Sequence, residues 1–177
     1  MKEVLLHICC GVCASSVVQR LREESFSVVG FFYNPNIHPE AEYLKRRQVA
    51  CEVSRILKFE LIPASYDKDN WFTKIKGLEN EPEGGLRCST CFKIRLEETQ
   101  KKASQMNMPR FTTTLTVSPH KNTAIINDIG RAISPYGFLA CDFKKQDGFR
   151  LAIDFAKQYN LYRQNYCGCI YSKTSKE

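Results

Sequence analysis

The chain opens with Val4-Leu5-Leu6-His7-Ile8-Cys9-Cys10-Gly11-Val12-Cys13, a short apolar run that leads directly into three closely spaced cysteines. The apolar run is typical of a buried strand. After it, apolar residues recur with the spacing of one helix face, at positions 14, 17, 18 and 21. A strand, a tight loop and a helix in this order begin an α/β unit. We therefore expect an α/β fold whose first loop carries thiols.

Strands and helices alternate along the rest of the chain, which predicts a mostly parallel sheet with helices on both faces. We predict a single-domain Rossmann-like α/β fold over residues 1–177 that ends in a cysteine-rich C-terminal loop. The predicted strands after the first are residues 27–33, 59–63, 111–115 and 138–140. The predicted helices after the first are residues 40–57, 69–75 and 150–159, with two more beginning at Cys88 and Ser118, and residues 165–172 are predicted to be a terminal loop.

The composition is that of a globular protein. Of 177 residues, 43% are hydrophobic and 25% are charged, which excludes collagen, a coiled coil and a disordered tail. No apolar run approaches the roughly 18–20 residues of a membrane span, and the first residues lack the apolar centre of a secretory signal. We therefore expect a cytoplasmic protein without a membrane partner. The net charge of +7 favours an acidic partner such as nucleic acid.

Nine cysteines are the unusual feature of the composition. Cys51 and Cys141 stand alone, and we expect them to pack as small apolar residues. In a reducing compartment, grouped cysteines usually indicate a metal site or catalysis rather than disulfides. Seven cysteines fall into three groups, namely Cys9, Cys10 and Cys13; Cys88 and Cys91; and Cys167 and Cys169.

The topology predicts that the three groups meet. In an open parallel sheet, the site lies outside the carboxyl ends of the strands. The first cysteine group follows the first predicted strand, and Ser118–Lys121 follow the fourth, so both loops lie at one edge. The helix that begins at Cys88 and the C-terminal loop can reach that edge too.

Seven thiols allow more than one kind of centre. A structural Zn²⁺ takes four ligands, and an iron–sulfur cluster typically takes four thiolates. Seven cysteines are therefore too many for one zinc and one short of two all-cysteine sites. The thiols left over from a cluster could hold a second metal or act as a redox dithiol. We expect the helix dipole to lower the pKa of Cys13 and Cys88, because each is predicted to begin a helix.

The histidines and basic residues have plain structural interpretations as well as functional ones. His7 should be a satisfied core or supporting histidine, and His38 a loop residue. Ser118 is predicted to cap a helix, where His120 would lie beside an anion-binding end. The run Lys45-Arg46-Arg47 is typical of a solvated helix face. Aromatic and basic residues alternate near the last cysteines in a pattern that suits either unpaired nucleotides or ordinary packing, at Tyr159, Tyr162, Arg163, Tyr166 and Tyr171.

Six ordered motifs extend this pattern from about Leu6 to Ser172. They are His7–Cys13; Tyr33–Pro39 with Glu42 and Tyr43; Arg87–Phe92 with Arg95 and Leu96; Phe111–Leu115 with Ser118–Lys121; Asp142–Lys145 with Gly148; and Leu161–Gln164 with Tyr166–Ser172. Together they closely resemble the QueH-type epoxyqueuosine reductases. That family commonly has Ala-Pro where this chain has Gly11-Val12, so we expect a more flexible first loop with the same thiols.

The resemblance implies the last step of queuosine biosynthesis, the reduction of epoxyqueuosine in a tRNA anticodon loop to queuosine. It implies two cofactors, a [4Fe–4S] cluster and a second metal ion beside it, which is iron, and no cobalamin. It also implies an electron donor, either a protein or a small reductant. The residues suit this chemistry, because a thiolate-ligated cluster carries electrons and a second metal can act as a Lewis acid on an epoxide oxygen.

Candidate roles follow for individual residues. The seven grouped cysteines, Cys9, Cys10, Cys13, Cys88, Cys91, Cys167 and Cys169, are candidate metal ligands. All of them except Cys13 are also assigned to the cluster cofactor. The candidate catalytic residues are Cys9, Cys13, His120 and Lys144. Lys121 joins His120 and Lys144 as a candidate for phosphate contact or proton supply, and Asp67 and Asp142 are candidate carboxylate helpers.

Two other functions are compatible with an α/β domain that carries clustered cysteines. The first is a cluster-dependent tRNA thiolation enzyme, which would normally carry a Ser-Gly-Gly-x-Asp-Ser loop after the first strand. This chain has Cys9–Cys13 at that place, which argues against ATP-dependent thiolation. A zinc-stabilised tRNA-binding module would be colourless and would lose its fold on chelation.

Overall fold

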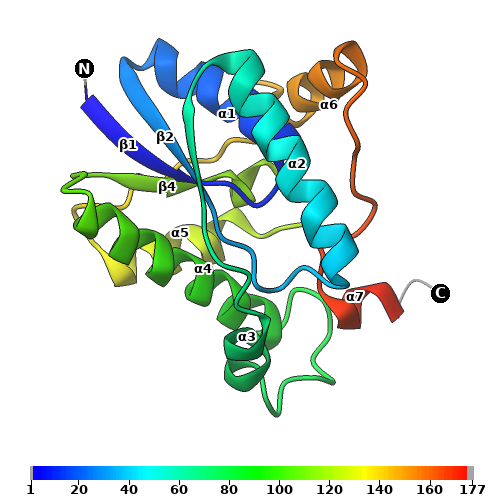
Figure 1. Ribbon diagram of the computed structural model, residues 1–177. Helices are drawn as coiled ribbons and strands as arrows, with labels where there is room; N and C mark the ends of the chain where they lie inside the picture. The colour runs from blue at the N-terminus through cyan, green and yellow to red at the C-terminus, as the bar shows by residue number, and fades with distance from the viewer. Residues whose placement is uncertain (1, 175–177) are drawn as a thin grey trace.

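The fold is built on a parallel sheet of four strands. The computed structural model describes residues 2–174, in which the strands lie in the order β3-β2-β1-β4 (Figure 1). Every pairing is parallel, so the carboxyl ends of all four strands point to one edge. The predicted α/β class is therefore confirmed. The strands are β1 (Lys2–His7), β2 (Phe26–Phe32), β3 (Glu60–Pro63) and β4 (Phe111–Thr113).

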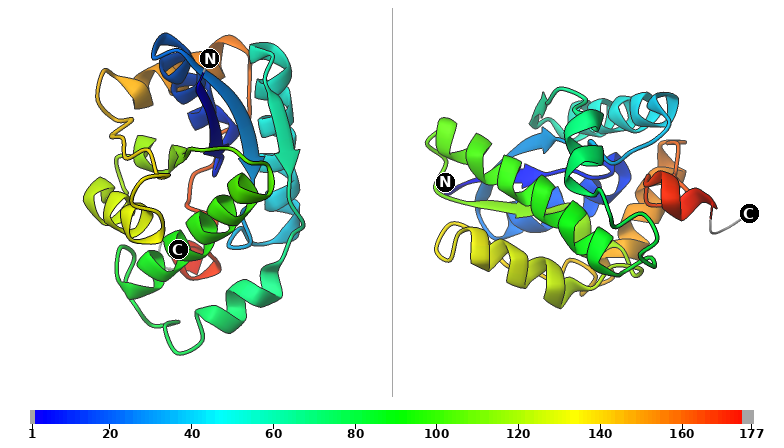
Figure 2. Two further views of the ribbon diagram at one scale, coloured as in Figure 1. Left: turned by 90° about the vertical axis from the view of Figure 1, so that its left-hand side faces the viewer. Right: turned by 90° about the horizontal axis from the view of Figure 1, so that it is seen from below.

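Helices cover both faces of this sheet, as the two further views confirm (Figure 2). One face carries α1 (Gly11–Glu23), α2 (Glu40–Leu57) and α6 (Gly148–Gln158). The other face carries α3 (Lys68–Lys74), α4 (Leu86–Gln105) and α5 (Thr123–Ile133). The 3₁₀ turn η1 (Thr114–Val117) follows β4, and the short α7 (Ile170–Thr174) follows the last cysteines. Among residues 2–174, no helix has the length and apolar character that crossing a membrane requires.

The central strand β1 separates two hydrophobic cores. Its side chains alternate between the faces of the sheet, as pleating requires. Val4 and Leu6 pack into one core with residues of α1, whereas Leu5 packs into the other with Phe92 and Leu96 of α4. Burial on both faces explains why the strand is an unbroken apolar run instead of an alternating one.

Several predicted boundaries were wrong around β4. The strand ends at Thr113, because its hydroxyl oxygen accepts a hydrogen bond from Leu115 N and begins a 3₁₀ turn. The helix predicted from Ser118 begins at Thr123, where Asn122 is the N-cap and accepts from Ile125 N at 3.2 Å. His120 therefore lies in a turn before the helix and not at its first residue.

Two further predictions at the C-terminal end need correction. The strand predicted over residues 138–140 is a single bridge between Phe138 and Phe111. The predicted terminal loop over 165–172 runs into α7, which begins at Ile170. Prediction was better for α2, whose observed bounds are those expected from the sequence.

The first loop is more tightly packed than expected. Gly11 is the first residue of α1 and is buried against α2. A Cβ atom at this position would lie 2.6 Å from Ala50 N, which is far closer than a van der Waals contact. The glycine therefore allows two helices to approach each other, and the expectation of a more flexible loop was wrong.

Two histidines are buried beside the carboxyl ends of the strands. His7 is completely buried, with Nδ1 2.9 Å from Thr113 Oγ1 and Nε2 3.0 Å from Tyr33 O, as expected of a core histidine. Burial is the largest of the causes that lower its pKa to about 3. His38 is a loop residue, as predicted, but it is buried against the rings of Trp71 and Phe72.

We predict that acid destabilises the protein through His7. Below pH 6.5 the unfolded chain binds a proton on this imidazole, whereas the folded chain binds one only near pH 3. The free energy of unfolding should therefore fall with decreasing pH over this window, by up to about 1.4 kcal/mol per pH unit from this residue. The free energy of unfolding can be measured by chemical denaturation at several pH values between pH 7 and pH 4. It should fall less steeply with decreasing pH for His7→Gln than for the parent or for His120→Gln. Parallel slopes for all three proteins would contradict the assignment.

Candidate functional site

The seven grouped cysteines line one cavity at the carboxyl edge of the sheet. The cavity has a volume of about 290 Å³ and is walled by the β1–α1 loop, the start of α4, the turn before α5 and the segment between α6 and α7. Cys51 and Cys141 are absent from its walls and are both partly buried elsewhere. The structure thus joins three groups that lie far apart in the sequence, Cys9, Cys10 and Cys13; Cys88 and Cys91; and Cys167 and Cys169.

The first wall is formed where β1 passes into α1. The backbone N–H of Cys9 donates to Thr114 Oγ1 at 3.0 Å, and the same hydroxyl lies 3.3 Å from Cys9 Sγ. Asn34 Nδ2 supports the preceding residue by donating to Ile8 O at 2.8 Å. Cys10 is the extended N-cap residue of α1, and Cys13 lies one turn further on. The loop is therefore held by side chains that follow β2 and β4.

The second wall is formed by the first two turns of α4. Cys88 and Cys91 are three residues apart, so they share one face of the helix. The backbone N–H of Gly84 donates to Cys88 Sγ at 3.2 Å. Arg87 is buried and donates to the carbonyls of Leu78 and Glu79, which ties the preceding loop to the helix.

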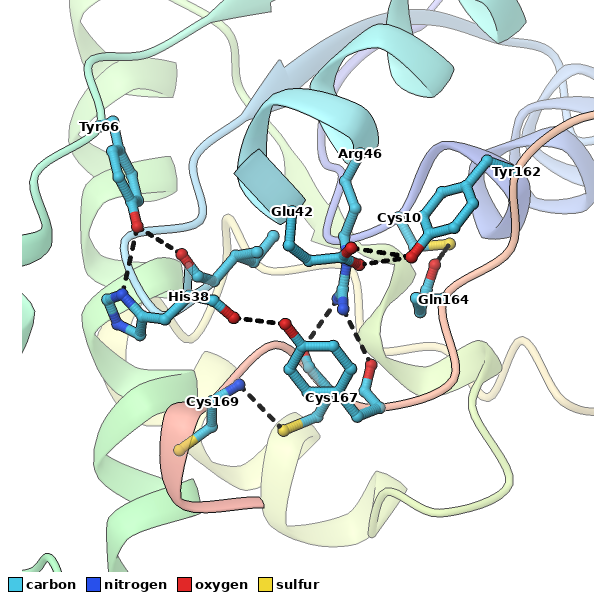
Figure 3. A network of polar contacts seen from close by, with 11 residues as sticks. Cys10, His38, Glu42, Arg46, Tyr66, Tyr162, Gln164, Cys167 and Cys169 are labelled. Carbon is cyan, nitrogen blue, oxygen red and sulfur yellow. Dashed lines mark hydrogen bonds and ion pairs between the residues drawn. The ribbon is translucent and has the colours of Figure 1, made fainter. Parts of the chain in front are cut away.

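The third wall is the segment of residues 159–169, which we call the strap. It joins α6 to α7 without a regular helix or strand and carries Cys167 and Cys169. Gly168 between them has a φ of +109°, and its carbonyl accepts a hydrogen bond from His38 N at 2.8 Å. Gln164 of the strap lies beside the first wall, with its Oε1 3.1 Å from Cys10 Sγ (Figure 3).

Two pairs of thiols share hydrogen bonds, and this sharing separates their pKa values. The bond from Cys13 is the largest cause that lowers the pKa of Cys10 to about 6, and the same bond raises the pKa of Cys13. In the C-terminal pair, the bond from Cys169 lowers the pKa of Cys167 to about 4 and raises that of Cys169. Each pair therefore combines one sulfur whose pKa is lowered with one whose pKa is raised.

The expected effect of the helix dipole on Cys13 and Cys88 was wrong. The pKa of Cys13 is raised because it is the donor in its pair, and burial raises the pKa of Cys88. The thiolate-prone sulfur of the first loop is instead that of Cys10, at the N-cap position.

The cavity carries an excess of positive charge. Glu83 is the one carboxylate among its lining residues. Arg87 and Arg95 are buried in its walls, and neither forms an ion pair with a carboxylate among the described residues, 2–174. Lys121 and Arg163 also line the cavity and are more exposed. This charge favours thiolates and other anions inside the site.

The other candidate residues divide into two sets. His120 and Lys121 line the cavity together with the cysteines. Lys144 does not line it, because its ammonium binds the carbonyl of Lys121 at 3.4 Å and the hydroxyl of Thr123. Asp142 and Asp67 lie outside the cavity as well, with Asp142 Oδ1 3.7 Å from Lys144 Nζ and Asp67 exposed before α3. Among the alternating aromatic and basic residues, Arg163 and Tyr166 line the cavity, whereas Tyr159, Tyr162 and Tyr171 do not.

Arg46 was misread from the sequence. The basic run around it suggested a solvated helix face, yet only 2% of the Arg46 surface is exposed. Its side chain turns inward and binds the strap (Figure 3). The helical spacing could have predicted this burial. Arg46 lies three residues from both Tyr43 and Val49, so it lies beside them on the buried face of the helix.

Thiols are the side chains that iron–sulfur and zinc centres use as ligands. Among residues 2–174, no three side chains of His, Cys, Asp or Glu are already drawn together in the arrangement of an ion site. Seven thiols on the walls of one cation-rich cavity nevertheless fit a thiolate-ligated group in their chemistry, their number and their charge.

Comparison with known proteins places these features in a family. A family model described as "Epoxyqueuosine reductase QueH" matches residues 4–175. An epoxyqueuosine reductase QueH from Acinetobacter baylyi is 38% identical over 174 residues, covering 96% of this chain and 80% of the relative.

Solved structures share the fold at much lower identity. A predicted subunit of tRNA methyltransferase from Methanocaldococcus jannaschii superposes with a TM-score of 0.61 at 13% identity, covering 86% of this chain and 75% of the other. The U34-tRNA thiolase NcsA from Methanococcus maripaludis, solved with its [4Fe–4S] cluster, has a TM-score of 0.55 at 11% identity, covering 93% and 58% of the two chains. These two likenesses concern the fold alone.

We predict that Gly168→Ala destabilises the protein more than Gly84→Ala. Both glycines have positive φ, so either substitution should cost about 1–2 kcal/mol of backbone strain. A Cβ at Gly168 would also lie 2.9 Å from Ile37 Cγ1 and 3.2 Å from Arg46 Nη1, whereas nothing lies within 4 Å of one at Gly84. Overpacking should add about 1 kcal/mol or more at Gly168. If a denaturant titration showed the same loss of unfolding free energy for Gly168→Ala and Gly84→Ala, the close fit of the strap would be contradicted.

Proposed function

Because the chain belongs to the epoxyqueuosine reductase QueH family, we propose that its seven grouped cysteines divide between a [4Fe–4S] cluster and a second metal ion, iron, in the one cavity. Family membership makes the protein an oxidoreductase of queuosine biosynthesis whose substrate is a tRNA. The single observation that carries the proposal is the convergence of all seven thiols on that cavity.

The reaction removes the epoxide oxygen of epoxyqueuosine and leaves an alkene. Both carbon–oxygen bonds break, two electrons and two protons enter, and the oxygen leaves as water. The electrons come from an external donor, either a protein or a small reductant. When bound, the cluster supplies electron transfer and the second metal supplies Lewis acidity towards the oxygen.

The chain's own residues hold these groups and supply charge. The cysteines of the three walls are the ligands, and the thiolate-prone sulfurs of Cys10 and Cys167 are ready to bind a metal without first losing a proton to a strong base. The buried guanidiniums of Arg87 and Arg95 offset the negative charge that several thiolates bring into one cavity.

The more exposed rim of the cavity suits a tRNA loop. His120, Lys121 and Arg163 lie there, where cations can contact phosphates and the imidazole can supply a proton. Recognition of RNA loops commonly uses bases that are splayed out of the stack into a pocket. Cys9 and Cys13, one on each side of the N-cap residue of α1, are the thiols that we place nearest to the reacting groups. Lys144 acts indirectly, by fixing the backbone of Lys121.

Anaerobic purification tests the proposed function directly. We expect a brown protein with a broad absorption band near roughly 400 nm that fades on reduction, and with more iron than one cluster holds. Added reductant should then convert epoxyqueuosine-tRNA to queuosine-tRNA. A colourless protein that contains only zinc and binds tRNA would overturn the reductase mechanism in favour of a zinc-stabilised RNA-binding module.

Cysteine substitutions should separate the cavity from the rest of the chain. Alanine at any of the seven lining cysteines should lower iron or sulfide content and reduce turnover by at least about tenfold, because a ligand or reacting thiol is lost. Cys51→Ala and Cys141→Ala are matched controls outside the cavity and should keep wild-type metal content and activity. Metal loss in the controls equal to that in the lining variants would show that the cavity is not the site.

A further inference from the structure

The strap brings two cysteines to the cavity without a helix or strand to hold them. Residues 159–169 contain Cys167 and Cys169, and their positions depend on side-chain contacts with the rest of the protein. A segment without regular structure opens more easily than a packed helix or strand. The contacts that hold it therefore decide where the two thiols lie.

Arg46 makes the central contact with the strap. Its Nη2 donates to Tyr166 O at 3.1 Å and its Nη1 donates to Cys167 O at 3.1 Å (Figure 3). The guanidinium also lies over the Tyr166 ring, 5.0 Å from its centroid. These two carbonyls belong to consecutive residues, one of which is Cys167 itself. One rigid, planar group thus fixes the two peptide units on either side of Cys167, namely Tyr166–Cys167 and Cys167–Gly168.

Glu42 holds Arg46 in this orientation. Its Oε1 lies 2.7 Å from Arg46 Nε, and both residues are buried. The same carboxylate accepts hydrogen bonds from Tyr162 OH at 2.8 Å and 3.0 Å. Glu42 is therefore bound to the beginning of the strap while Arg46 is bound to its end. Removal of one member of this buried pair would leave an unpaired charge, which is costly.

A second contact holds the strap from the neighbouring loop. His38 N donates to Gly168 O at 2.8 Å, and Tyr166 OH donates to His38 O. Gly168 also approaches Arg46 closely enough that a Cβ atom would lie 3.2 Å from Nη1. The strap is thus seated on the α2 side of the cavity, with the guanidinium between it and the helix.

We propose that Arg46 is a positioning residue, oriented by Glu42, that seats the strap so that Cys167 and Cys169 face the cavity. It touches neither the substrate nor a reacting atom, and it acts through the two carbonyls that it binds. The importance of Arg46 for catalysis rests on the proposed function, in which Cys167 and Cys169 are metal ligands.

The test compares Arg46→Gln with Arg47→Gln in the full chain purified without oxygen. Arg47 is the adjacent exposed arginine of α2 and makes a matched control. Brief alkylation followed by mass spectrometry gives the labelling rate of each cysteine separately. We expect Cys167 and Cys169 to react at least about tenfold faster in Arg46→Gln, with iron and sulfide content reduced by at least half, because a buried ion pair is broken. Arg47→Gln should match the parent in both measurements.

Cysteines elsewhere distinguish a displaced strap from general unfolding. Faster labelling of Cys167 and Cys169 with unchanged labelling of Cys51 and Cys141, which lie outside the cavity, supports the proposal. An equal rise at Cys51 and Cys141 means that Arg46 only stabilises the fold, and it overturns the proposal. Unchanged labelling in Arg46→Gln overturns it too. Arg46→Lys keeps the charge but cannot reach both carbonyls as a planar fork, so it should restore little of the protection.

Tyr162→Phe keeps the test decisive if Arg46→Gln fails to fold. It removes only the hydroxyl that binds Glu42, and it should accelerate labelling of the two strap cysteines by a smaller, measurable factor. Unchanged labelling of both cysteines in this variant would overturn the proposal. The proposed function fails separately if the parent protein holds no iron–sulfur group. In that case the difference in cysteine labelling between Arg46→Gln and Arg47→Gln still decides the role of Arg46.

Discussion

The structure depends on the burial of β1 from all sides. This strand is paired along both edges, and each face lies under a layer of helices. Its last residue, His7, therefore ends inside the molecule, and the next thiols enter a space already surrounded by other elements. The parallel arrangement sends β2 and β4 to the same edge, where Asn34 and Thr114 fix the first loop. A cysteine site at this point follows from the topology of the sheet.

The three walls of the cavity are held in different ways. The first loop and α4 are held by secondary structure, with a helix beginning at or near each cysteine group. The strap lacks that support and is held by a buried charge on a neighbouring helix. Arg46 and Gly168 serve the same geometry from opposite sides, because the guanidinium needs two accessible carbonyls and the glycine lets the backbone come close enough to offer them. The wall with the least regular structure therefore has the most specific side-chain contacts.

Sequence reasoning predicted the sheet, both helical layers and the meeting of the cysteine groups, because hydrophobic periodicity and parallel topology are local or general properties. It failed where one side chain redirected the backbone. Thr113 ended β4 early, and Asn122 rather than Ser118 capped α5. It failed for Arg46 because a run of three basic residues resembles a solvent-facing surface, and the carbonyls that bury this charge lie about 120 residues away. The thiol pKa values also depend on burial and on neighbouring thiols in the folded chain, which the spacing of cysteines in the sequence does not encode.

The cations of the cavity lie at two depths, and dissolved salt acts on them unequally. Lys121 and Arg163 are open enough to solvent for counterions to screen them at physiological ionic strength, whereas Arg87 and Arg95 are buried and nearly insensitive to it. Rising ionic strength therefore weakens the attraction of the rim for a polyanion while the potential around the thiols stays almost constant. Encounter with nucleic acid and the internal chemistry of the cavity are thus separable by salt concentration alone.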